Sequence, residues 1–426
     1  MRSLRRREFL QLGLATGGLL LAGCSPDSRS RSALSSARVV VAGGGFGGMA
    51  AARYLKALAP QLTVTLIDRL PIYIRCPGSN GVIAGLTHAD SLGHVLEPGL
   101  SKAHIPFIQA DITSIEPATR RIGLADGSSF GYDRLILSPG IDFRWDAIEG
   151  YDEAASLRLP HAWKAGEQTR LLQRQFQAMR RGGTVLITVP ENPYRCPPGP
   201  YERASLMAHA LKQHKRRGKI LILDAKTRFS KQAAFLHAWA TLYPGIVEWI
   251  PSEREGRLDH VDARRRTVHT EFGAYRADVI NIIPPQRAGR LAQRAGVADA
   301  SGWCPVDPLN FASTLQPDIH VIGDACSAFP MPKSAFSAQS QARVCAEAVL
   351  ASLLERPTLP TKLINHCYSF VAPDRAISVT GVYAYQADQR QLTTVSSGET
   401  GPDGDWQQEA RYAQDWYRLL VQETFG

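Results

Sequence analysis

The segment Ala37-Arg38-Val39-Val40-Val41-Ala42-Gly43-Gly44-Gly45-Phe46-Gly47-Gly48 joins a β-branched run directly to a glycine-rich turn. A helix-compatible segment continues to Leu58, a second strand-like run covers residues 62–67, and Asp68 closes it. The order of strand, glycine turn, helix, strand and acid predicts a dinucleotide-binding βαβ unit, because the acid follows the last glycine by 20 residues. We expect a pyrophosphate at the N-terminus of the helix.

Each glycine of this turn predicts one contact with the dinucleotide. Gly43 permits the tight turn, Gly45 lets the backbone approach the pyrophosphate, and Gly48 lets the helix and the strand pack closely. Asp68 is predicted to bind the adenosine ribose hydroxyls.

Two later strands complete the predicted domain and indicate which dinucleotide it binds. Residues 132–140 end in a small-residue turn, and residues 319–325 contain Gly323-Asp324 before a helix that we expect to reach Leu354. In flavoproteins with two dinucleotide domains, a Gly-Asp pair at this place bonds the ribityl chain and phosphate of FAD, which an NAD site does not require. The sequence therefore favours FAD as the cofactor.

A second βαβ-like unit lies between these segments, with predicted strands at 183–189 and 219–223 and a predicted helix at 202–215. The loop after its first strand, residues 190–200, holds five prolines and one glycine. Proline has no backbone N–H to offer a phosphate and fixes φ, so this loop cannot form a glycine-type phosphate cradle. We expect the second unit to lack a nicotinamide site and to present Cys196 instead.

These patterns predict an α/β fold with two dinucleotide-binding, Rossmann-like domains of the disulfide-reductase type and a smaller C-terminal α+β domain. The predicted FAD-binding domain comprises residues 37–150 and 271–355, the second domain 151–270, and a C-terminal domain covering the flavin or a partner surface 356–426. Within the last we expect a strand over 376–383 and a helix over 406–425.

The first 23 residues are predicted to be an export signal. Residues 5–10 read as a twin-arginine motif, whose receptor takes folded, cofactor-bearing proteins. Leu21-Ala22-Gly23-Cys24 matches a lipoprotein cleavage site, so either Cys24 carries a lipid or cleavage nearby discards it. Residues 24–36 are predicted to be a flexible tether. Both alternatives place the mature protein in the periplasm.

Composition excludes several classes of protein. Hydrophobic residues make up 44% and charged residues 21% of the 426 residues, which excludes disordered, collagen-like and coiled-coil chains. The basic runs at 212–219 and 264–266 are short and lack interleaved aromatics, so we expect a solvated face or a docking patch for an acidic partner, and no nucleic acid. No c-type haem motif or zinc-type Cys/His spacing is present.

The seven cysteines divide by position. Cys76 lies on the loop after the second strand, which in this fold passes the dimethylbenzene edge of a flavin, so it is either a flavin-linking or a structural thiol. Cys196 lies in the proline-stiffened loop, which suits a sulfur held over a flavin ring. The sequence alone indicates no disulfide partner for Cys367. The other three cysteines are predicted to be small buried hydrophobic residues: Cys304, Cys326 and Cys345.

The chain resembles the flavoprotein subunit of flavocytochrome c sulfide dehydrogenase, a relative of sulfide:quinone oxidoreductases and of the disulfide reductases. The resemblance runs from Ala37 to the C-terminus. Its most specific stretches are residues 159–166, 195–205, 283–289 and 302–307.

This resemblance implies roles for five residues. Cys76 corresponds to the cysteine that carries FAD through a thioether to the 8α-methyl group, and Trp416 to an aromatic residue close to the flavin. Cys196 and Cys367 correspond to a redox-active disulfide that faces the flavin, and Glu202 to an acid/base group. Two features depart from the family pattern: Pro77-Gly78 follows Cys76 where an aromatic or apolar residue is expected, and the signal is of the lipoprotein type.

The resemblance implies a sulfide dehydrogenase that oxidises hydrosulfide to sulfur or polysulfide and passes electrons to a c-type cytochrome on a separate chain. One alternative is a sulfide:quinone oxidoreductase, which would need an apolar C-terminal surface, whereas the terminal segment here carries many charges. Another is a non-catalytic, flavin-bearing subunit that docks a cytochrome. An NAD(P)H oxidoreductase is disfavoured by the proline-filled loop.

Overall fold

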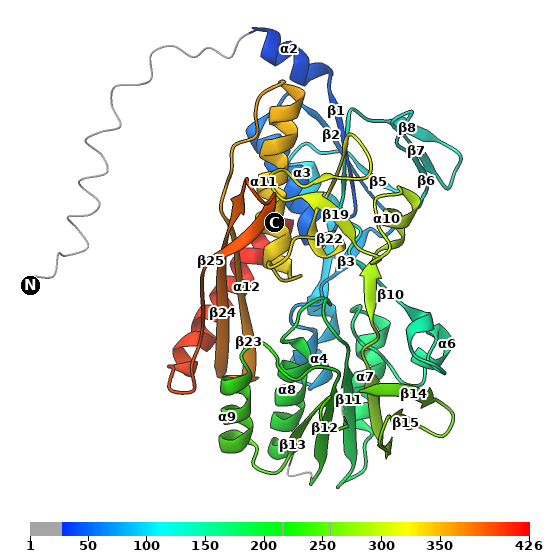
Figure 1. The fold of residues 1–426 in the computed structure, drawn as a ribbon, viewed down its shortest axis with the longest axis vertical. Helices are drawn as coiled ribbons and strands as arrows, with labels where there is room; N and C mark the ends of the chain where they lie inside the picture. Colours follow the sequence, from blue (N-terminus) through cyan, green and yellow to red (C-terminus); the bar gives the residue numbers. More distant parts are fainter. Residues whose placement is uncertain (1–27, 215–216, 256) are drawn as a thin grey trace, which may run out of the picture.

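The structure is a computed structural model that describes residues 28–214, 217–255 and 257–426 (Figure 1). The predicted signal and Cys24 lie outside the described residues. Within the predicted tether, residues 28–36 form helix α2 (Ser28–Ser36), and Leu34 of this helix is buried in the core. The tether prediction therefore needs correction over these residues, because the buried leucine anchors them to the fold.

The first domain is built on a sheet in the order β22-β19-β20-β21-β9-β1-β2-β5. Its central strands run parallel, in register from β21 through β9 and β1 to β2 and β5. The strands of this sheet are β1 (Arg38–Ala42), β2 (Thr63–Asp68), β5 (Phe107–Gln109), β9 (Arg134–Leu137), β19 (Cys304–Asp307), β20 (Ala312–Ser313), β21 (Ile319–Val321) and β22 (Cys326–Ser327). Helices α3 (Phe46–Leu58) and α11 (Ala335–Leu353) pack against each other beside it. The predicted strand, glycine turn and helix at residues 37–58 are confirmed.

The first domain also contains shorter strands and helices. They are β3 (Ile72–Ile74), α4 (Ser79–Ile83), β4 (Gly93–Val95), α5 (Leu96–Lys102), β6 (Ile112–Glu116), β7 (Arg121–Leu124), β8 (Ser129–Gly131) and α10 (Arg290–Arg294). Strands β10 (Ile141–Phe143) and β18 (Gln286–Ala288) pair antiparallel where the chain leaves for the second domain and returns from it.

The second domain has a four-stranded parallel sheet in the order β13-β12-β11-β17. Its strands are β11 (Thr184–Val189), β12 (Lys219–Asp224), β13 (Val247–Pro251) and β17 (Val279–Ile282). Its helices are α6 (Glu153–Ser156), α7 (Glu167–Gln177), α8 (Gly199–Gln213) and α9 (Gln232–Leu242), and a small sheet comprises β14 (Leu258–Asp262), β15 (Thr267–Thr270) and β16 (Ala274–Arg276).

The predicted boundary at residue 270 is therefore displaced. Strand β17 falls within the 271–355 segment assigned to the FAD domain, yet it pairs with β11 of the second domain and is buried along its whole length. A short, fully buried apolar run fits either parallel sheet, so sequence alone could not assign it.

The C-terminal unit is an antiparallel sheet of β23 (Leu363–Ala372), β24 (Arg375–Gln386) and β25 (Gln391–Glu399), followed by α12 (Trp406–Phe425). The predicted helix has the bounds of α12, and the predicted strand lies within β24. Strand β23 packs against α11 of the first domain and α8 of the second, while α12 covers β24 (Figure 1). The unit thus lies along both Rossmann-like domains.

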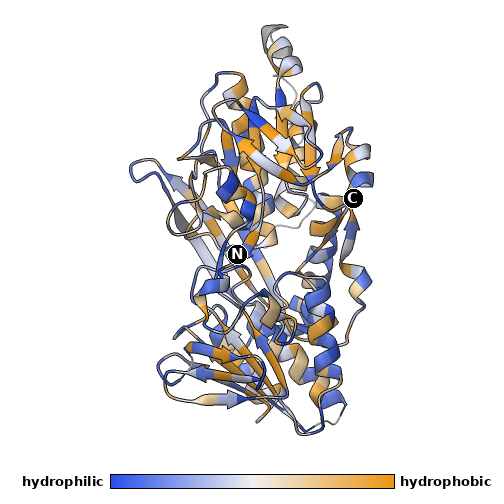
Figure 2. Cartoon of the chain, turned by 90° about the vertical axis from the view of Figure 1, so that its right-hand side faces the viewer, coloured by the Kyte–Doolittle hydropathy of each residue, from blue (hydrophilic) through white to orange (hydrophobic). Residues whose placement is uncertain are grey.

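Hydrophobic residues run along the strands of the two parallel sheets, and hydrophilic residues predominate in the loops (Figure 2). In the part of the chain that the structure describes, no helix is both long and apolar enough to pass through a bilayer.

Candidate active site

The glycine turn between β1 and α3 has the geometry that a pyrophosphate site requires. Gly43 has a φ of +111°, and a Cβ on Gly48 would lie 1.8 Å from the Gly43 carbonyl oxygen. Gly45 is the N-cap of α3, and its carbonyl accepts the Met49 N–H. A side chain at Gly43 or Gly48 would force the turn away from the helix, so glycine keeps the N-terminal N–H groups of α3 accessible to an anion.

Asp68 lies at the end of β2, beside this turn. One carboxylate oxygen accepts the Gly44 N–H at 2.6 Å and the other accepts the Leu70 N–H at 2.9 Å. The carboxylate is partly exposed, and each oxygen keeps a further lone pair for a ribose hydroxyl.

The Gly-Asp pair after β21 offers the second half of a flavin site. Gly323 has a φ of +76°, and Asp324 follows it with Oδ1 buried and without a hydrogen-bond partner. The other oxygen, Oδ2, lies 3.7 Å from Nη1 of Arg195. A buried acceptor without a donor is costly, and a ribityl hydroxyl is a donor of the right kind.

Two further buried polar atoms in this part of the molecule lack partners, Trp416 Nε1 and Gln286 Nε2. Both are donors, and an isoalloxazine ring presents carbonyl and ring-nitrogen acceptors. The ring of Trp416 packs against Phe336 at 5.8 Å and Tyr368 at 5.5 Å between centroids. With the glycine turn and Asp324, these unsatisfied atoms fit a bound FAD.

Cys76 lies on the loop between β3 and α4, where its thiol donates to the carbonyl oxygen of Trp163 at 3.5 Å. The unexpected Pro77-Gly78 that follows is held in place. Tyr417 of α12 donates to the Pro77 carbonyl oxygen at 2.6 Å, and Arg75 donates to the same oxygen at 3.0 Å. Gly78, with a φ of +87°, is the N-cap of α4. Pro77 and Gly78, which depart from the family pattern, thus lie in a loop whose conformation is fixed by these hydrogen bonds.

Cys196 is fixed by its backbone in the proline-rich loop before α8. Its φ of +56° is left-handed, its N–H donates to the Lys333 carbonyl oxygen at 2.8 Å, and its carbonyl accepts the Gly199 N–H at 2.9 Å. A Cβ on Gly199 would lie 3.1 Å from the Cys196 sulfur, so the sulfur sits at the N-terminus of α8. A non-glycine residue in this conformation carries strain, which is common at functional sites.

Cys367 lies in the middle of β23, opposite Val379 of β24, and the structure holds both Cys196 and Cys367 as free thiols. Burial, and then the charge of Cys367, raises the pKa of Cys196 well above its usual value. Burial also raises the pKa of Cys367, while Lys231 lowers it. The two predicted cysteines, distant in sequence, therefore share one electrostatic environment.

Glu202 belongs to the same cluster. Its Oε1 accepts the Phe370 N–H of β23 at 2.9 Å, and its Oε2 accepts the Asn80 side-chain N–H at 2.7 Å. Burial raises the pKa of this carboxyl, against the effect of both hydrogen bonds. A buried carboxyl with a raised pKa beside thiols is a candidate to hold or release a proton.

Lys231 is a member of the cluster that the sequence analysis missed. It is 1% exposed and precedes α9 with a φ of +61°. Its ammonium donates to Ser369 Oγ at 2.8 Å and to the Cys367 carbonyl oxygen at 3.5 Å. The only sequence signal was a lysine next to an apolar helix, which is common on protein surfaces.

The second domain shows why an acid at the end of its second strand would not bind a ribose. Asp224 is fully buried, and its Oδ2 accepts the Tyr201 hydroxyl at 2.5 Å and the Trp249 N–H at 3.0 Å. Its Oδ1 forms an ion pair with Lys226 at 2.6 Å. Both oxygens are occupied within the protein, whereas Asp68 of the first domain keeps an exposed edge.

The remaining cysteines are core residues, as predicted. Cys304, Cys326 and Cys345 are at most 2% exposed. Burial raises the pKa of Cys304 and of Cys326 to about 12, so both stay as thiols.

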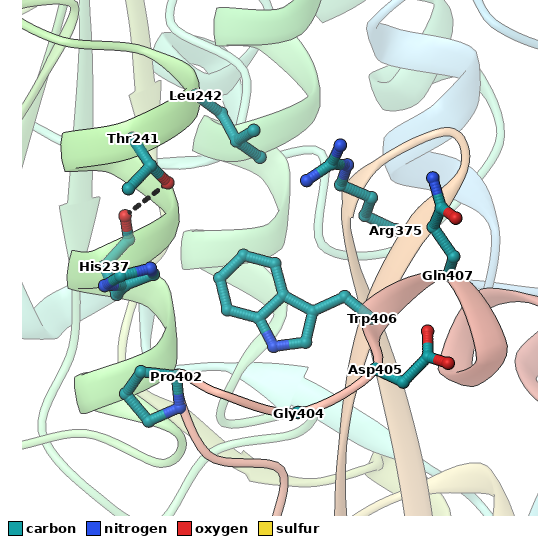
Figure 3. A pocket seen from close by; sticks show the side chains of 9 residues that line it. All are labelled: His237, Thr241, Leu242, Arg375, Pro402, Gly404, Asp405, Trp406 and Gln407. Carbon is teal, nitrogen blue, oxygen red and sulfur yellow. Dashed lines mark hydrogen bonds between the residues drawn. The ribbon is translucent and has the colours of Figure 1, made fainter.

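An open pocket of about 410 Å³ lies away from this cluster, between α9 and the loop before α12 (Figure 3). His237 and Trp406 face each other across it, and the Thr241 hydroxyl donates to the His237 carbonyl oxygen. None of its lining residues is a predicted site residue, so it gives no support to a second active site.

Three family descriptions match the chain. Residues 169–284 match the central domain of the flavoprotein chain of sulfide dehydrogenase (flavocytochrome c), and residues 360–425 match the flavin-binding domain of flavocytochrome c sulphide dehydrogenase. Residues 37–176 match the pyridine nucleotide-disulphide oxidoreductases. Together they cover residues 37–284 and 360–425.

Individual relatives agree with these matches. The chain is 51% identical, over 45 residues, to the sulfide dehydrogenase (flavocytochrome c) flavoprotein chain of Chlorobaculum thiosulfatiphilum, covering 11% of this chain and 94% of that sequence. It is 23% identical to the mitochondrial sulfide:quinone oxidoreductase of Mus musculus, covering 72% of this chain and 69% of that protein.

Among solved structures, the sulfide:quinone oxidoreductase of Aquifex aeolicus superimposes with a TM-score of 0.70 at 18% identity, covering 91% of each chain. This likeness confirms the predicted α/β fold of the disulfide-reductase type. With the family descriptions and the Chlorobaculum sequence, the chain belongs to the flavoprotein chains of flavocytochrome c sulfide dehydrogenase.

Proposed function

We propose that this flavoprotein oxidises hydrosulfide to sulfur or polysulfide through a Cys196–Cys367 disulfide and FAD, and passes the electrons to a c-type cytochrome. The observation that carries the proposal is the cluster of Cys196, Cys367 and Glu202. They come from the loop before α8, from β23 and from α8; α8 packs against β23, and Glu202 Oε1 accepts the Phe370 N–H of β23 at 2.9 Å. The family membership, with relatives named for sulfide oxidation, supports the same reaction.

The chain's own residues provide a substrate acceptor and a proton site. Hydrosulfide is a soft nucleophile, and a disulfide between Cys196 and Cys367 is an acceptor that it attacks by ordinary thiol–disulfide exchange. This attack leaves a persulfide on one cysteine and a thiolate on the other. Glu202, with its raised pKa, holds or releases a proton beside them.

FAD, when bound, supplies a two-electron acceptor that can pass electrons on one at a time. The residues that would hold it are Gly43, Gly45 and Gly48 at the pyrophosphate, Asp68 at the ribose, Gly323 and Asp324 at the ribityl chain, and Trp416 at the ring; their geometry supports this assignment. We further propose a thioether from Cys76 to the flavin, since its loop is fixed by Tyr417 and Arg75.

A substitution in the cysteine pair tests the reaction. In Cys367→Ala holoenzyme, mixed anaerobically with sulfide, we expect flavin bleaching at 450 nm to be lost. The matched control is Cys345→Ala, because Cys345 is a buried core thiol on α11 that retains no role in the proposal. Unchanged bleaching in Cys367→Ala would refute the proposed reaction, and absence of bleaching in the unsubstituted protein would favour a flavin-bearing docking subunit.

The electron acceptor separates this proposal from a sulfide:quinone oxidoreductase. Exposed residues of α12 include Tyr412 and Leu419, but the helix also carries an exposed ion pair between Arg418 and Asp415 at 3.0 Å. This mixed surface suits a polar protein partner better than a bilayer. We expect sulfide-dependent reduction of cytochrome c to exceed that of a water-soluble quinone, and the opposite order would assign a quinone acceptor.

We also propose that the protein acts in the periplasm after export in the folded state. The twin-arginine motif and Cys24 support this, and the latter provides a site for a lipid anchor. The mass of the mature N-terminal peptide tests it: a diacylglycerol adduct on Cys24 is expected, and an N-terminus beyond Cys24 would indicate a free periplasmic form.

A further inference from the structure

Lys231 places a positive charge inside the cysteine cluster. The residue lies directly before α9, and its side chain crosses to β23 of the C-terminal unit. Its ammonium donates to Ser369 Oγ at 2.8 Å, to the Ile377 carbonyl oxygen at 3.4 Å and to the Cys367 carbonyl oxygen at 3.5 Å. With 1% of its surface exposed, the lysine has no access to bulk water.

All three of these acceptors are neutral. Lys231 forms no salt bridge among the described residues, although the charges of Glu202 and Glu399 act on its ammonium from a greater distance. Glu399 accepts the backbone N–H of Lys231 at 2.9 Å, and Glu202 is engaged by Phe370 and Asn80. A buried ammonium without a paired anion is unfavourable at rest. A negative charge that forms nearby would compensate for this cost.

We infer that Lys231 stabilises a negative charge on the sulfur of Cys367, so that Cys367 is the leaving thiolate and hydrosulfide attacks the sulfur of Cys196. This inference rests on the proposed sulfide oxidation, and it adds a positioning residue and a direction of attack to it.

The step balances within the cluster. The sulfur–sulfur bond between Cys196 and Cys367 breaks, and a new one forms between hydrosulfide and Cys196. The Cys367 sulfur leaves with the bonding electron pair and is reduced, while the hydrosulfide sulfur is oxidised and its proton stays on the new persulfide. Thiol–disulfide exchange favours the leaving sulfur with the lower pKa.

The titratable groups around the two sulfurs act on both thiols. For Cys367, burial raises the pKa first, Lys231 opposes it, and Glu202 adds to it. For Cys196, burial, Cys367 and Glu202 all raise the pKa, and Lys231 and Arg195 offset only part of this, leaving it well above its usual value. The other titratable neighbours of the ammonium are His366 and Glu399. Arg195 and the N-terminus of α8 also favour a thiolate at Cys196, so the direction of attack is inferred from the contact of the Lys231 ammonium with Cys367.

The first test measures the acidity of the Cys367 thiol directly, without sulfide. Holoenzyme is reduced with a phosphine, and the rate of iodoacetamide alkylation at Cys367 is followed by peptide mass spectrometry between pH 6 and pH 10. In Lys231→Met the midpoint should rise by about one pH unit or more, as expected for loss of a nearby opposite charge. Lys231→Arg keeps the positive charge, so its alkylation midpoint should lie between those of Lys231→Met and the unsubstituted protein. Lys212→Met is the matched control, since Lys212 donates to the Leu242 carbonyl at the surface.

The second test uses the unsubstituted protein and so does not depend on the folding of a variant. One equivalent of sulfide is added and quenched with an alkylating agent, and the persulfide is located by peptide mapping. A persulfide on Cys196 is the expected result. A persulfide on Cys367, or an unchanged alkylation midpoint in a Lys231→Met protein that retains its flavin spectrum, would overturn the inference.

Failure of the proposed function would be distinguishable. If sulfide oxidation through the disulfide is wrong, either sulfide fails to bleach the flavin of the unsubstituted protein or Cys367→Ala still permits bleaching, and in both cases no cysteine carries a persulfide. If only the inference is wrong, Cys367→Ala abolishes bleaching while Lys231→Met leaves the midpoint in place.

Discussion

Acid should destabilise this protein through His161, a buried histidine that fixes the loop beside Cys76. Its Nδ1 accepts the Trp163 N–H at 2.9 Å, and the Trp163 carbonyl oxygen in turn accepts the Cys76 thiol. Burial, aided by Lys164, Arg203 and Arg195, lowers the pKa of His161 from 6.5 to about 3. Since the folded protein holds the neutral ring, the stabilisation is complete above pH 6.5 and is lost as the pH falls toward 3.

The magnitude follows from the two pKa values. Each unit of difference is worth about 1.4 kcal/mol, so the full window of 6.5 to about 3 corresponds to about 5 kcal/mol. Between pH 7 and pH 5 the expected loss of unfolding free energy is about 2 kcal/mol from this residue. Other buried histidines, such as His320, add their own losses.

The comparison of the unsubstituted protein with His161→Asn isolates this contribution. The asparagine oxygen can accept the Trp163 N–H but takes up no proton in this range. Urea unfolding at pH 7, 6 and 5, followed by tryptophan fluorescence, should show a decline that is about 2 kcal/mol smaller in the variant. If the unfolding free energies of the two proteins declined equally between pH 7 and pH 5, His161 would not be a buried neutral base.

Three further substitutions test the cofactor and the proton site. Cys76→Ser should release FAD into the supernatant on acid precipitation, whereas the unsubstituted protein should keep its flavin in the pellet; release from both would exclude the thioether. Gly48→Ala should yield protein without 450 nm absorbance, because the new Cβ would lie 1.8 Å from the Gly43 carbonyl oxygen, and normal flavin content would contradict this. Glu202→Gln should remove an ionisation above pH 4.5 from the pH profile of sulfide-dependent flavin reduction, since burial raises the Glu202 pKa; an identical stopped-flow profile would place the proton elsewhere.

Local patterns predicted much of the fold. The run from Ala37 to Asp68 and the terminal helix were readable because strand and helix periodicity, glycine turns and closing residues lie within short windows. The C-terminal boundary of the second domain was not readable, because β17 is a fully buried run that either sheet could accept. Helix α2 depends on the burial of Leu34, which is a tertiary contact.

The cofactor residues of the candidate site were predictable from the glycine turn and the Gly-Asp pair, whereas the grouping of the cysteine cluster was predictable only from the family resemblance. Cys196, Cys367 and Glu202 come from separate elements, and nothing in their spacing brings them together. Lys231 contacts Ser369, which is 138 positions away in the chain. A contact of this kind is created by the packing of β23 on α8, so no local motif could have revealed it.

The charges buried around the cysteines favour an anionic substrate. Cations outnumber carboxylates in this region; the cations are Lys231, Arg195, Arg203 and Lys333, and the carboxylates are Glu202 and Asp324. Burial raises the pKa of both carboxyls, which reduces the negative charge further. A buried positive excess draws an anion such as hydrosulfide and lowers the cost of the cysteine thiolate that its attack on a disulfide would release. At the end of the second strand of the second domain, in contrast, the buried Asp224 forms an ion pair with Lys226, so the charge of this lysine is already compensated within the protein.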